Sequence, residues 1–570
     1  MKPSPKRWFI FSLSVLITLV VSLGLLHLLG LETAARSLAP ATIESNIATD
    51  TIWTLANSPY LITETVVIQP GAALTIEPGV MVQANGPGFA VLSVAAGGRL
   101  EATGTAAQPI TFTSAANNGP GDWASLVIAG SARLQHTVFQ NSAYNLDVIG
   151  AAGGPVLVAD SLLQNAVYGL RVTTPALPRL TLSNVTFTNN LTNRVRVENM
   201  AAISDSITAP FTLTAQTGLD GYEFPGIIRL TDGVTMSMAP GVTVFGKEFG
   251  VDANAHVAAL GTAVSPITFT SVANSATGEW NHFLLLGSAR FNYAHFRYGG
   301  VNLALSGSSG GDVIVENSYF EAAAWGGLMT TPSAWHRLQL ANNSFVNSAD
   351  RILLDLDTGE TTLAGNVTAP AQTGLAGYQM MPPTPSGNPA LIIPQGITLT
   401  LEPGVTLWTA ASVPIQVNGR LQASGTAVNP ITFTTLLTNT QRWSGIIVSG
   451  TAELWHTRVE ESGSNGLWVT GGRVTAVCSA FTNNAAAGVQ VSNTGAPQVS
   501  LFDGDIVNNG AGVTNNHSAP VDARYNWWGD ANGPAPGDTS GNVQVSPWLT
   551  EPSDCSTLPE NVYLPLMIRP

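Results

Sequence analysis

Leu74-Thr75-Ile76-Glu77-Pro78-Gly79-Val80 is the stretch that decides the fold, because the chain repeats it twice. It returns as Met236-Ser237-Met238-Ala239-Pro240-Gly241-Val242 and again as Leu399-Thr400-Leu401-Glu402-Pro403-Gly404-Val405, and its prolines are 162 and 163 residues apart. The first and third residues of each copy are apolar, as in a strand with one face toward a core. Self-similarity at a fixed period is the signature of a repeat architecture.

A second motif follows each copy and defines three tandem modules of roughly 160 residues. Gly104-Thr105-Ala106 and the nearby Pro-Ile-Thr-Phe-Thr are matched within residues 261–270 and 425–434, and a tryptophan comes next each time. The recurring tryptophans are Trp123, Trp280 and Trp443. We expect modules at residues 50–210, 211–368 and 369–550, the third with a terminal Asn-Trp-Trp-Gly coil.

A shorter period of 22 to 25 residues runs inside every module. It spaces the apolar residues Phe139, Leu163, Phe187; Phe296, Phe320, Phe345; and Val459, Phe481, Ile506. This period is too long for a hairpin and too short for a strand-helix-strand unit. Three short strands joined by turns fit it, if successive coils stack at the strand spacing of about 4.8 Å.

In the first module an asparagine stands two residues after each member of the apolar column, and stacked coils explain this spacing. Asn tolerates left-handed backbone and can hydrogen-bond to the next coil, so it is expected at a turn. The sequence therefore predicts an all-β parallel β-helix, a solenoid, preceded by an N-terminal apolar helix. The joints at residues 217–222 and 373–378 leave open whether one solenoid continues or three are separate.

The repeated motifs and the ending from Tyr525 through Trp548 resemble those of bacterial right-handed parallel β-helix repeat proteins, which have the pectate-lyase-like fold. The resemblance covers about residues 50–550. It implies a right-handed solenoid. It implies no single function, because this fold hosts lyases, hydrolases, adhesins and inert surface proteins.

The composition excludes several other classes of protein. Of the 570 residues, 45% are apolar and 10% are charged, so the chain is neither a disordered polyelectrolyte nor a charged coiled coil. The formal net charge of −14 would repel phosphate backbones, and no nucleic acid partner is expected.

The N-terminus predicts export. Lys2, Lys6 and Arg7 precede an uncharged run from Trp8 to Leu31, which is typical of a signal peptide. The run is also long enough to span a bilayer, so residues 1–35 are a signal peptide or an N-terminal membrane anchor, the one expected membrane contact. Residues 36–49 are expected to be a linker and residues 551–570 a C-terminal tail. The protein is expected to be extracellular or at the cell surface.

Arg351, Asp355 and Asp357 are the best local match to an enzyme site. The resemblance to pectate lyases implies grouped acids for Ca²⁺ or acid/base chemistry and an Arg or Lys base. Residues i and i+2 of a strand share a face, which would bring the two carboxylates together. No other module repeats the pair, so a solvated strand end is favoured, with no catalytic residue and no cofactor; Ca²⁺ is the alternative. Asp503-Gly504-Asp505 has the same spacing and is interpreted as a turn.

Aromatic residues supply the candidate binding surface. The three recurring tryptophans are interpreted as packed turn residues. Trp325 and Trp335 do not recur, and with Tyr298 they are candidates for stacking against sugar rings. A core or turn position is the alternative for these three residues.

Cys478 and Cys555 are the only cysteines of the chain, and export permits a disulfide between them. Cys478 lies at the edge of a coil, so the bridge would join the tail to the third module.

His136 and His456 align between modules, but Tyr293 takes their place in the second. An outward amphipathic position is therefore favoured over a metal ligand.

These patterns favour a non-catalytic extracellular or cell-surface protein, structural or adhesive, that binds polysaccharide or neighbouring cell-surface components. A polysaccharide lyase or glycoside hydrolase of the same fold is the alternative. An enzyme would need a charged groove concentrated in one module, with two carboxylates about 5 to 10 Å apart if it were a glycosidase.

Overall fold

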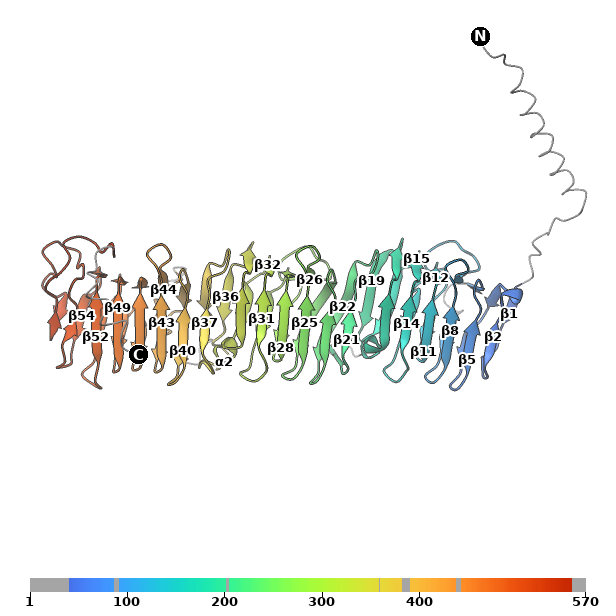
Figure 1. Cartoon of the computed structure of the whole chain (residues 1–570), viewed down its shortest axis with the longest axis horizontal. Coiled ribbons are helices and arrows are strands. Elements are labelled where there is room, and N and C mark those ends of the chain that lie inside the picture. The colour runs from blue at the N-terminus through green and yellow to red at the C-terminus, as the bar shows by residue number, and fades with distance from the viewer. Residues whose placement is uncertain are drawn as a thin grey trace, which may run out of the picture.

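Short parallel strands stack into a rod of about 19 turns in the part of the chain that the structure describes (Figure 1). This computed structural model describes residues 40–86, 92–200, 204–357, 359–381, 390–436 and 442–555. The prediction of an all-β parallel solenoid is confirmed. The predicted signal or anchor at residues 1–35 and the tail beyond residue 555 lie outside the described residues. No helix within those residues is long and apolar enough to cross a membrane.

The first coil begins earlier than expected. Strand β1 (Ala41–Ile43) pairs in register with β3 (Tyr60–Ile62), and Ile47 bridges to Ile68. The expected linker at residues 36–49 therefore ends before residue 41, because the apolar residues that follow already pack against the core.

The core consists of the columns that the short period predicts. In the second module Phe296 of β29 (Ala294–Arg297), Phe320 of β32 (Tyr319–Glu321) and Phe345 of β35 (Ser344–Val346) are paired in register. Their rings stack at centroid distances of 5.0 and 4.9 Å. The other modules pair Phe139, Leu163 and Phe187, and Val459, Phe481 and Ile506, in the same way. Each buried side chain contributes about 1.5 to 3 kcal/mol to folding.

Left-handed turns separate the strands, as the asparagines predict. The residue two positions after each column member has a positive φ, and six of these nine residues are Asn. A second set of left-handed residues lies at another corner of the coils, with φ between 44° and 57°. We call it the edge column; its members are His136, Asp160, Asn184, Tyr293, Asn317, Asn342, His456, Cys478, Asp503 and Tyr525.

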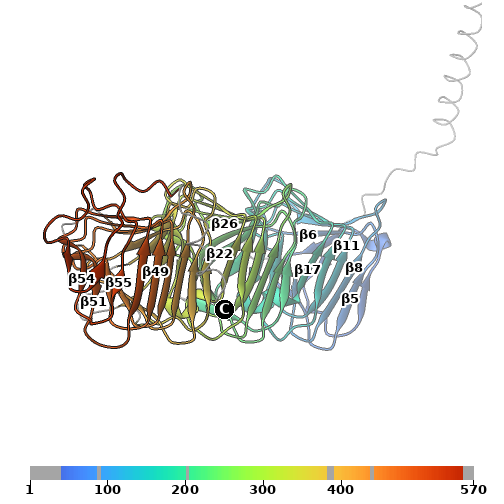
Figure 2. The same cartoon turned by 60° about the vertical axis from the view of Figure 1, so that its left-hand side comes forward.

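One solenoid continues through both joints, which answers the question left open by the sequence (Figure 2). At the first joint β19 (Thr192–Glu198) pairs with β22 (Gly221–Leu230), and at the second β36 (Arg351–Leu354) pairs with β38 (Gly377–Met380). One sheet contains strands of all three modules, whereas the sheets on the other faces start afresh at each joint.

A glycine makes each joint possible. Gly218 and Gly374 have φ of +71° and +70°, and a Cβ atom would lie 2.0 and 2.1 Å from the carbonyl oxygens of Phe187 and Phe345. A side chain is therefore excluded by both backbone conformation and space.

Candidate functional site

The predicted acidic pair of the second module does not lie on a strand face. Strand β36 ends at Leu354, and Asp355 and Asp357 follow it. Asp355 Oδ1 accepts a hydrogen bond from the backbone N–H of Asp357 at 2.9 Å. The expectation that both carboxylates point the same way along a strand is wrong, because the chain turns at this point.

Arg351 is directed toward the next coil. Its Nη1 donates to Gln379 Oε1 at 2.8 Å, and its guanidinium carbon lies 5.4 Å from the centroid of the Trp408 ring. A guanidinium held between an amide and an aromatic ring is poorly placed to act as a base.

The three residues of the candidate aromatic surface differ in how far they are buried. Trp335, in α2 (Pro332–Trp335), is 1% exposed and lies 5.4 Å from the Tyr378 ring, so its assignment to a ligand-binding surface is wrong. Trp325 is 70% exposed, and its backbone N–H donates to the Gly300 carbonyl on the neighbouring coil. Tyr298 is partly buried against the core on that coil.

The three recurring tryptophans are packed turn residues, as predicted. All three are buried, and each indole N–H donates to a backbone carbonyl of a later strand. The acceptors are Gln140, Arg297 and Glu460, at 2.8, 2.8 and 2.9 Å.

A row of charged side chains that starts on the first module and crosses the first joint was not predicted. Asp147 of β13 (Leu146–Val148), Arg171 of β16 (Tyr168–Thr173), Arg196 of β19 and Glu223 of β22 pair in register on successive coils. We call these four residues the ionic ladder. Aligning the charges at the coil period would have found it, since Asp147, Arg171 and Arg196 are 24 and 25 residues apart.

The ladder is internally neutralised. Arg171 binds both oxygens of Asp147, with Nε to Oδ1 at 2.9 Å, and Arg196 Nη1 contacts Glu223 Oε1 at 2.7 Å. Arg194 contacts the second oxygen of Glu223 at 3.1 Å. The hydrogen bond with Asp147 raises the pKa of Arg171, so its guanidinium stays charged.

Two tyrosines flank the ladder. The rings of Tyr144 and Tyr168 stack with centroids 5.8 Å apart, and Arg171 lies 4.3 Å above the Tyr144 ring. The equivalent positions of the second module carry Ala304, Met329 and Leu353 instead of charges. The combination of ionic ladder and tyrosines is therefore confined to the first module and the first joint.

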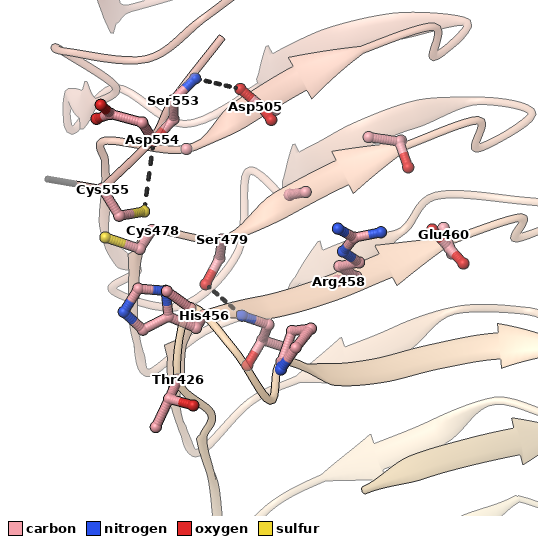
Figure 3. Close-up of a pocket in the computed structure, with 16 residues that line it drawn as sticks. Thr426, His456, Arg458, Glu460, Cys478, Ser479, Asp505, Ser553, Asp554 and Cys555 are labelled. Carbon is pink, nitrogen blue, oxygen red and sulfur yellow. Dashed lines mark hydrogen bonds between the residues drawn. The ribbon is translucent and has the colours of Figure 1, made fainter. Parts of the chain in front are cut away.

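A cavity of about 310 Å³ lies at the far end of the rod, along the edge column of the third module (Figure 3). The segment Ser553–Cys555 covers one side of it. Ser553 donates its N–H to Asp505 Oδ1 at 3.0 Å and its hydroxyl to the Asp503 carbonyl at 2.7 Å. The tail is therefore docked on the Asp503-Gly504-Asp505 turn.

Three metal-ligand side chains meet in this cavity. The ligand atoms of His456, Cys478 and Cys555 all lie within 4.8 Å of one another. Figure 3 shows the two sulfur atoms facing each other, with the His456 ring beside Cys478. The two cysteines are not joined by a disulfide in the structure, and the bond stays a prediction.

The ionisable groups of the cavity have shifted pKa values. Burial raises the pKa of Glu460, Asp503 and Asp505 and lowers that of His456. A hydrogen bond with Cys478 lowers the pKa of Cys555. Clustered shifts of this kind are common at functional sites. The interpretation of Asp503-Gly504-Asp505 as a turn is correct for the backbone. It did not predict that the tail segment would cover this turn.

The first module has a related cavity of about 340 Å³, and among the described residues no segment from outside the coils lines it. His136, Asp160 and Asn184 take the places of His456, Cys478 and Asp503. Asp160 accepts hydrogen bonds from Asn184 at 2.9 Å and from Gln135 at 3.2 Å. The same backbone thus carries an amide and carboxylate chain in one module and a thiol group in another.

Comparison with known proteins supports the fold. Residues 45–152 match the family described as pectate-lyase like beta helix domain. Neither the curated proteins nor the solved structures contain a match to the chain. The matched segment lies within the first module and its N-terminal coil, and the same coil geometry continues to the third module.

Proposed function

We propose that this chain, a pectate-lyase-like β-helix, is an exported, non-catalytic cell-surface protein that binds extracellular polysaccharide. The fold alone is compatible with several functions. The observation that carries this proposal is the ionic ladder of the first module with its stacked tyrosines. Aromatic faces pack against the apolar faces of sugar rings, and fixed charged groups can hydrogen-bond to sugar hydroxyls. The regular coil spacing places charged groups on four successive coils, which suits a short stretch of a linear polymer.

The pairing of the ladder supports a binding role over catalysis. A general acid or base must be free to exchange a proton with substrate. The carboxylates of Asp147 and Glu223 have side-chain exposures of 3% and 5%, and both oxygens of each are engaged by arginines. Such carboxylates position arginine side chains well and transfer protons poorly.

Trp325 supplies a second proposed contact on the middle module. At 70% exposure its ring is available to stack on a sugar, and Tyr298 lies on the neighbouring coil. Export and surface location, from the signal or anchor pattern of residues 1–35, are part of the same proposal.

The test is a binding and degradation screen of the chain from residue 36 against a panel of soluble polysaccharides. We expect retention by at least one polymer without release of new reducing or unsaturated ends. Replacing both Tyr144→Ala and Tyr168→Ala should weaken binding about tenfold, since each aromatic contact contributes about 0.5 to 1.5 kcal/mol.

Leu191→Ala is the matched control for the tyrosine pair. Leu191 is 73% exposed on the next coil, and it presents apolar surface without a ring. Loss of binding in Trp325→Ala alone would move the site to the second module. Failure of every polymer to bind would contradict the proposal.

A lyase or hydrolase is the second candidate, favoured by the cavity of the third module. Arg458, Glu460 and Asp505 line it, and burial raises the pKa of both acids, as a general acid requires. Release of new chain ends that is abolished by Glu460→Gln, and unchanged by the surface variant Glu316→Gln, would establish this alternative.

A further inference from the structure

The cluster of His456, Cys478 and Cys555 has a geometry that a disulfide does not need. Two sulfur atoms suffice for a disulfide, yet an imidazole nitrogen lies within 4.8 Å of both. No other group of three His, Cys, Asp or Glu side chains in the described residues brings its ligand atoms this close. We infer that, in the reduced protein, these three residues bind a zinc ion.

The fold brings the three ligands together from separate elements. His456 and Cys478 are successive members of the edge column, so the coil spacing places them next to each other. The Cys478 backbone N–H donates to the Phe502 carbonyl, which fixes its turn to the coil beyond. Cys555 arrives from the C-terminal segment, held by the contacts of Ser553 with the Asp503 turn.

The distances suit a tetrahedral ion after a small contraction. Zinc binds sulfur at about 2.3 Å and nitrogen at about 2.0 Å, which sets tetrahedral ligand atoms about 3.5 to 3.8 Å apart. The present limit of 4.8 Å requires an approach of about 1 Å between ligand atoms. Rotation of the Cys555 side chain on its terminal segment can supply it.

The ligand set selects the chemical class of the metal. Two thiolates and one imidazole are preferred by zinc over the hard cations Mg²⁺ and Ca²⁺, which take oxygen ligands. Two thiolates also neutralise a divalent ion. All three residues line the cavity of about 310 Å³, so the fourth coordination position has room for water or another small ligand.

A second observation points to a missing positive partner. Asp503 is 3% exposed, and its Oδ2 is a buried atom without a hydrogen-bond partner in the described part of the chain. The backbone carbonyl of the same residue lies 3.7 Å from Cys555 Sγ. The unpartnered oxygen therefore belongs to the turn on which the Cys555 segment docks.

The first module provides a built-in control. His136 occupies the equivalent place of the edge column, but Asp160 replaces the cysteine and no tail segment covers the cavity. Asp160 is engaged by Asn184 and Gln135. We therefore expect no zinc site there.

The experiment uses the full chain, stripped of metal and reduced, with both thiols counted by labelling of the unfolded protein. Zinc is titrated in and its stoichiometry is measured by mass spectrometry of the metal. Cobalt serves as the spectroscopic substitute, because thiolate ligation gives a charge-transfer band. We expect one zinc ion per chain, a cobalt–thiolate band, and no binding after oxidation of the thiols.

The variants separate the ligands from their surroundings. Cys478→Ser and His456→Asn should each lower zinc affinity by at least about tenfold, a loss that even outer partners of metal ligands cause. His136→Asn should bind as the wild type does. His456→Asn keeps both thiols, so it remains informative if a cysteine variant fails to fold.

Three results would overturn the inference. The first is a fully reduced wild-type chain that binds no zinc. The second is binding that persists in Cys478→Ser or His456→Asn. The third is a pair of thiols that cannot be reduced in the folded protein, which would establish a structural disulfide instead.

Discussion

Two aspartate pairs of identical spacing lie in the second and third modules and have opposite surroundings. Asp355 and Asp357 follow the end of β36, where Asp357 is exposed and its backbone N–H is bonded to Asp355. Asp503 and Asp505 lie under the segment Ser553–Cys555, and Asp503 is almost fully buried. The spacing of two acids along the chain therefore says little about their chemistry.

What separates the pairs is a covering segment from another part of the chain. The tail residues bond to Asp503 and Asp505 across about 50 residues of sequence. They exclude water, and burial raises the pKa of both carboxyl groups. A solenoid presents the same backbone on every coil, so a site arises where something outside the repeat packs on it.

Of the changes considered, removing Trp443 should most strongly destabilise the structure around Asp503 and Asp505. Its indole N–H donates to the carbonyl of Glu460, on the strand that lines the cavity. Trp443→Ala should lower the free energy of unfolding of this module by about 3 to 5 kcal/mol. Hydrogen exchange measured by mass spectrometry should show faster exchange in residues 457–482.

Trp123→Ala is the control for that change. It removes the equivalent indole from the first module, so a similar local loss is expected there while exchange near Asp505 stays unchanged. Equal acceleration at both ends of the rod in either variant would show that the coils unfold together, and the two pairs could not then be treated as local environments.

Oxidation of Cys478 and Cys555 to a disulfide should hold the segment Ser553–Cys555 against Asp503 and Asp505. A disulfide that closes this long loop stabilises a protein by about 4 kcal/mol at most, since the chain-entropy contribution grows slowly with loop length. We expect a mild oxidant to remove both reactive thiols and to raise the melting temperature. Two thiols that stay reactive in the unfolded, unreduced protein would contradict this.

Most of the fold was predictable from the sequence because a stacked coil is a local and repeated structure. The apolar columns, the left-handed asparagines and the recurring tryptophans each follow from spacing along the chain. The start of the first coil was missed, since a terminal coil has a neighbour on one side alone and weaker patterning. The joints needed the geometry of Gly218 and Gly374.

The sites were predictable only in part, for a physical reason. Period alignment could have revealed the ionic ladder, because its members lie on successive coils. The burial of Trp335 depends on a contact between α2 and Tyr378, which lie on different coils; the repeated joint motif contains Tyr378 but does not give this contact. The cluster of His456, Cys478 and Cys555 depends on where the tail docks, and no periodicity encodes that contact.

The two environments should also respond differently to pH. Burial raises the folded-state pKa of Asp503 and Asp505, so the folded state binds their protons more tightly than the unfolded state does. Their contribution to stability is fully present below the ordinary aspartate pKa and is lost as the pH rises through the raised values. Docking of the tail should therefore strengthen on mild acidification.

Melting temperatures of the wild type and of Asp503→Asn and Asp505→Asn, compared between neutral and mildly acidic pH, measure this effect. The variants should flatten the pH dependence. Glu279 provides the opposite sign, because hydrogen bonds from Ser271 and Ser275 lower its pKa to about 2. Its contribution is fully present above the ordinary glutamate pKa and is lost as the pH falls toward 2, so Glu279→Gln should lower stability at neutral pH and match the wild type only in strong acid. An identical pH profile for the wild type and the Asp503 variant would refute the assignment.

Replacing Asp355 and Asp357 should have the smallest effect, since Asp355 is half-buried and Asp357 is exposed. Asp355→Asn with Asp357→Asn keeps side chains of similar size and removes two charges beyond a strand end. The Asp355 side chain can still accept the 2.9 Å hydrogen bond from the Asp357 backbone through its amide oxygen. We expect the free energy of unfolding to change by well under 1 kcal/mol, since substitutions at exposed positions usually stay within about 0.5 kcal/mol. We also expect no calcium-dependent rise in the melting temperature, because Ca²⁺ takes six to eight oxygen ligands and this turn offers few. The measurement is a thermal melt of the wild type and the double variant with calcium and with a chelator. A calcium-dependent shift that disappears in the double variant would show that Asp355 and Asp357 bind Ca²⁺ and that this turn is more than a solvated strand end.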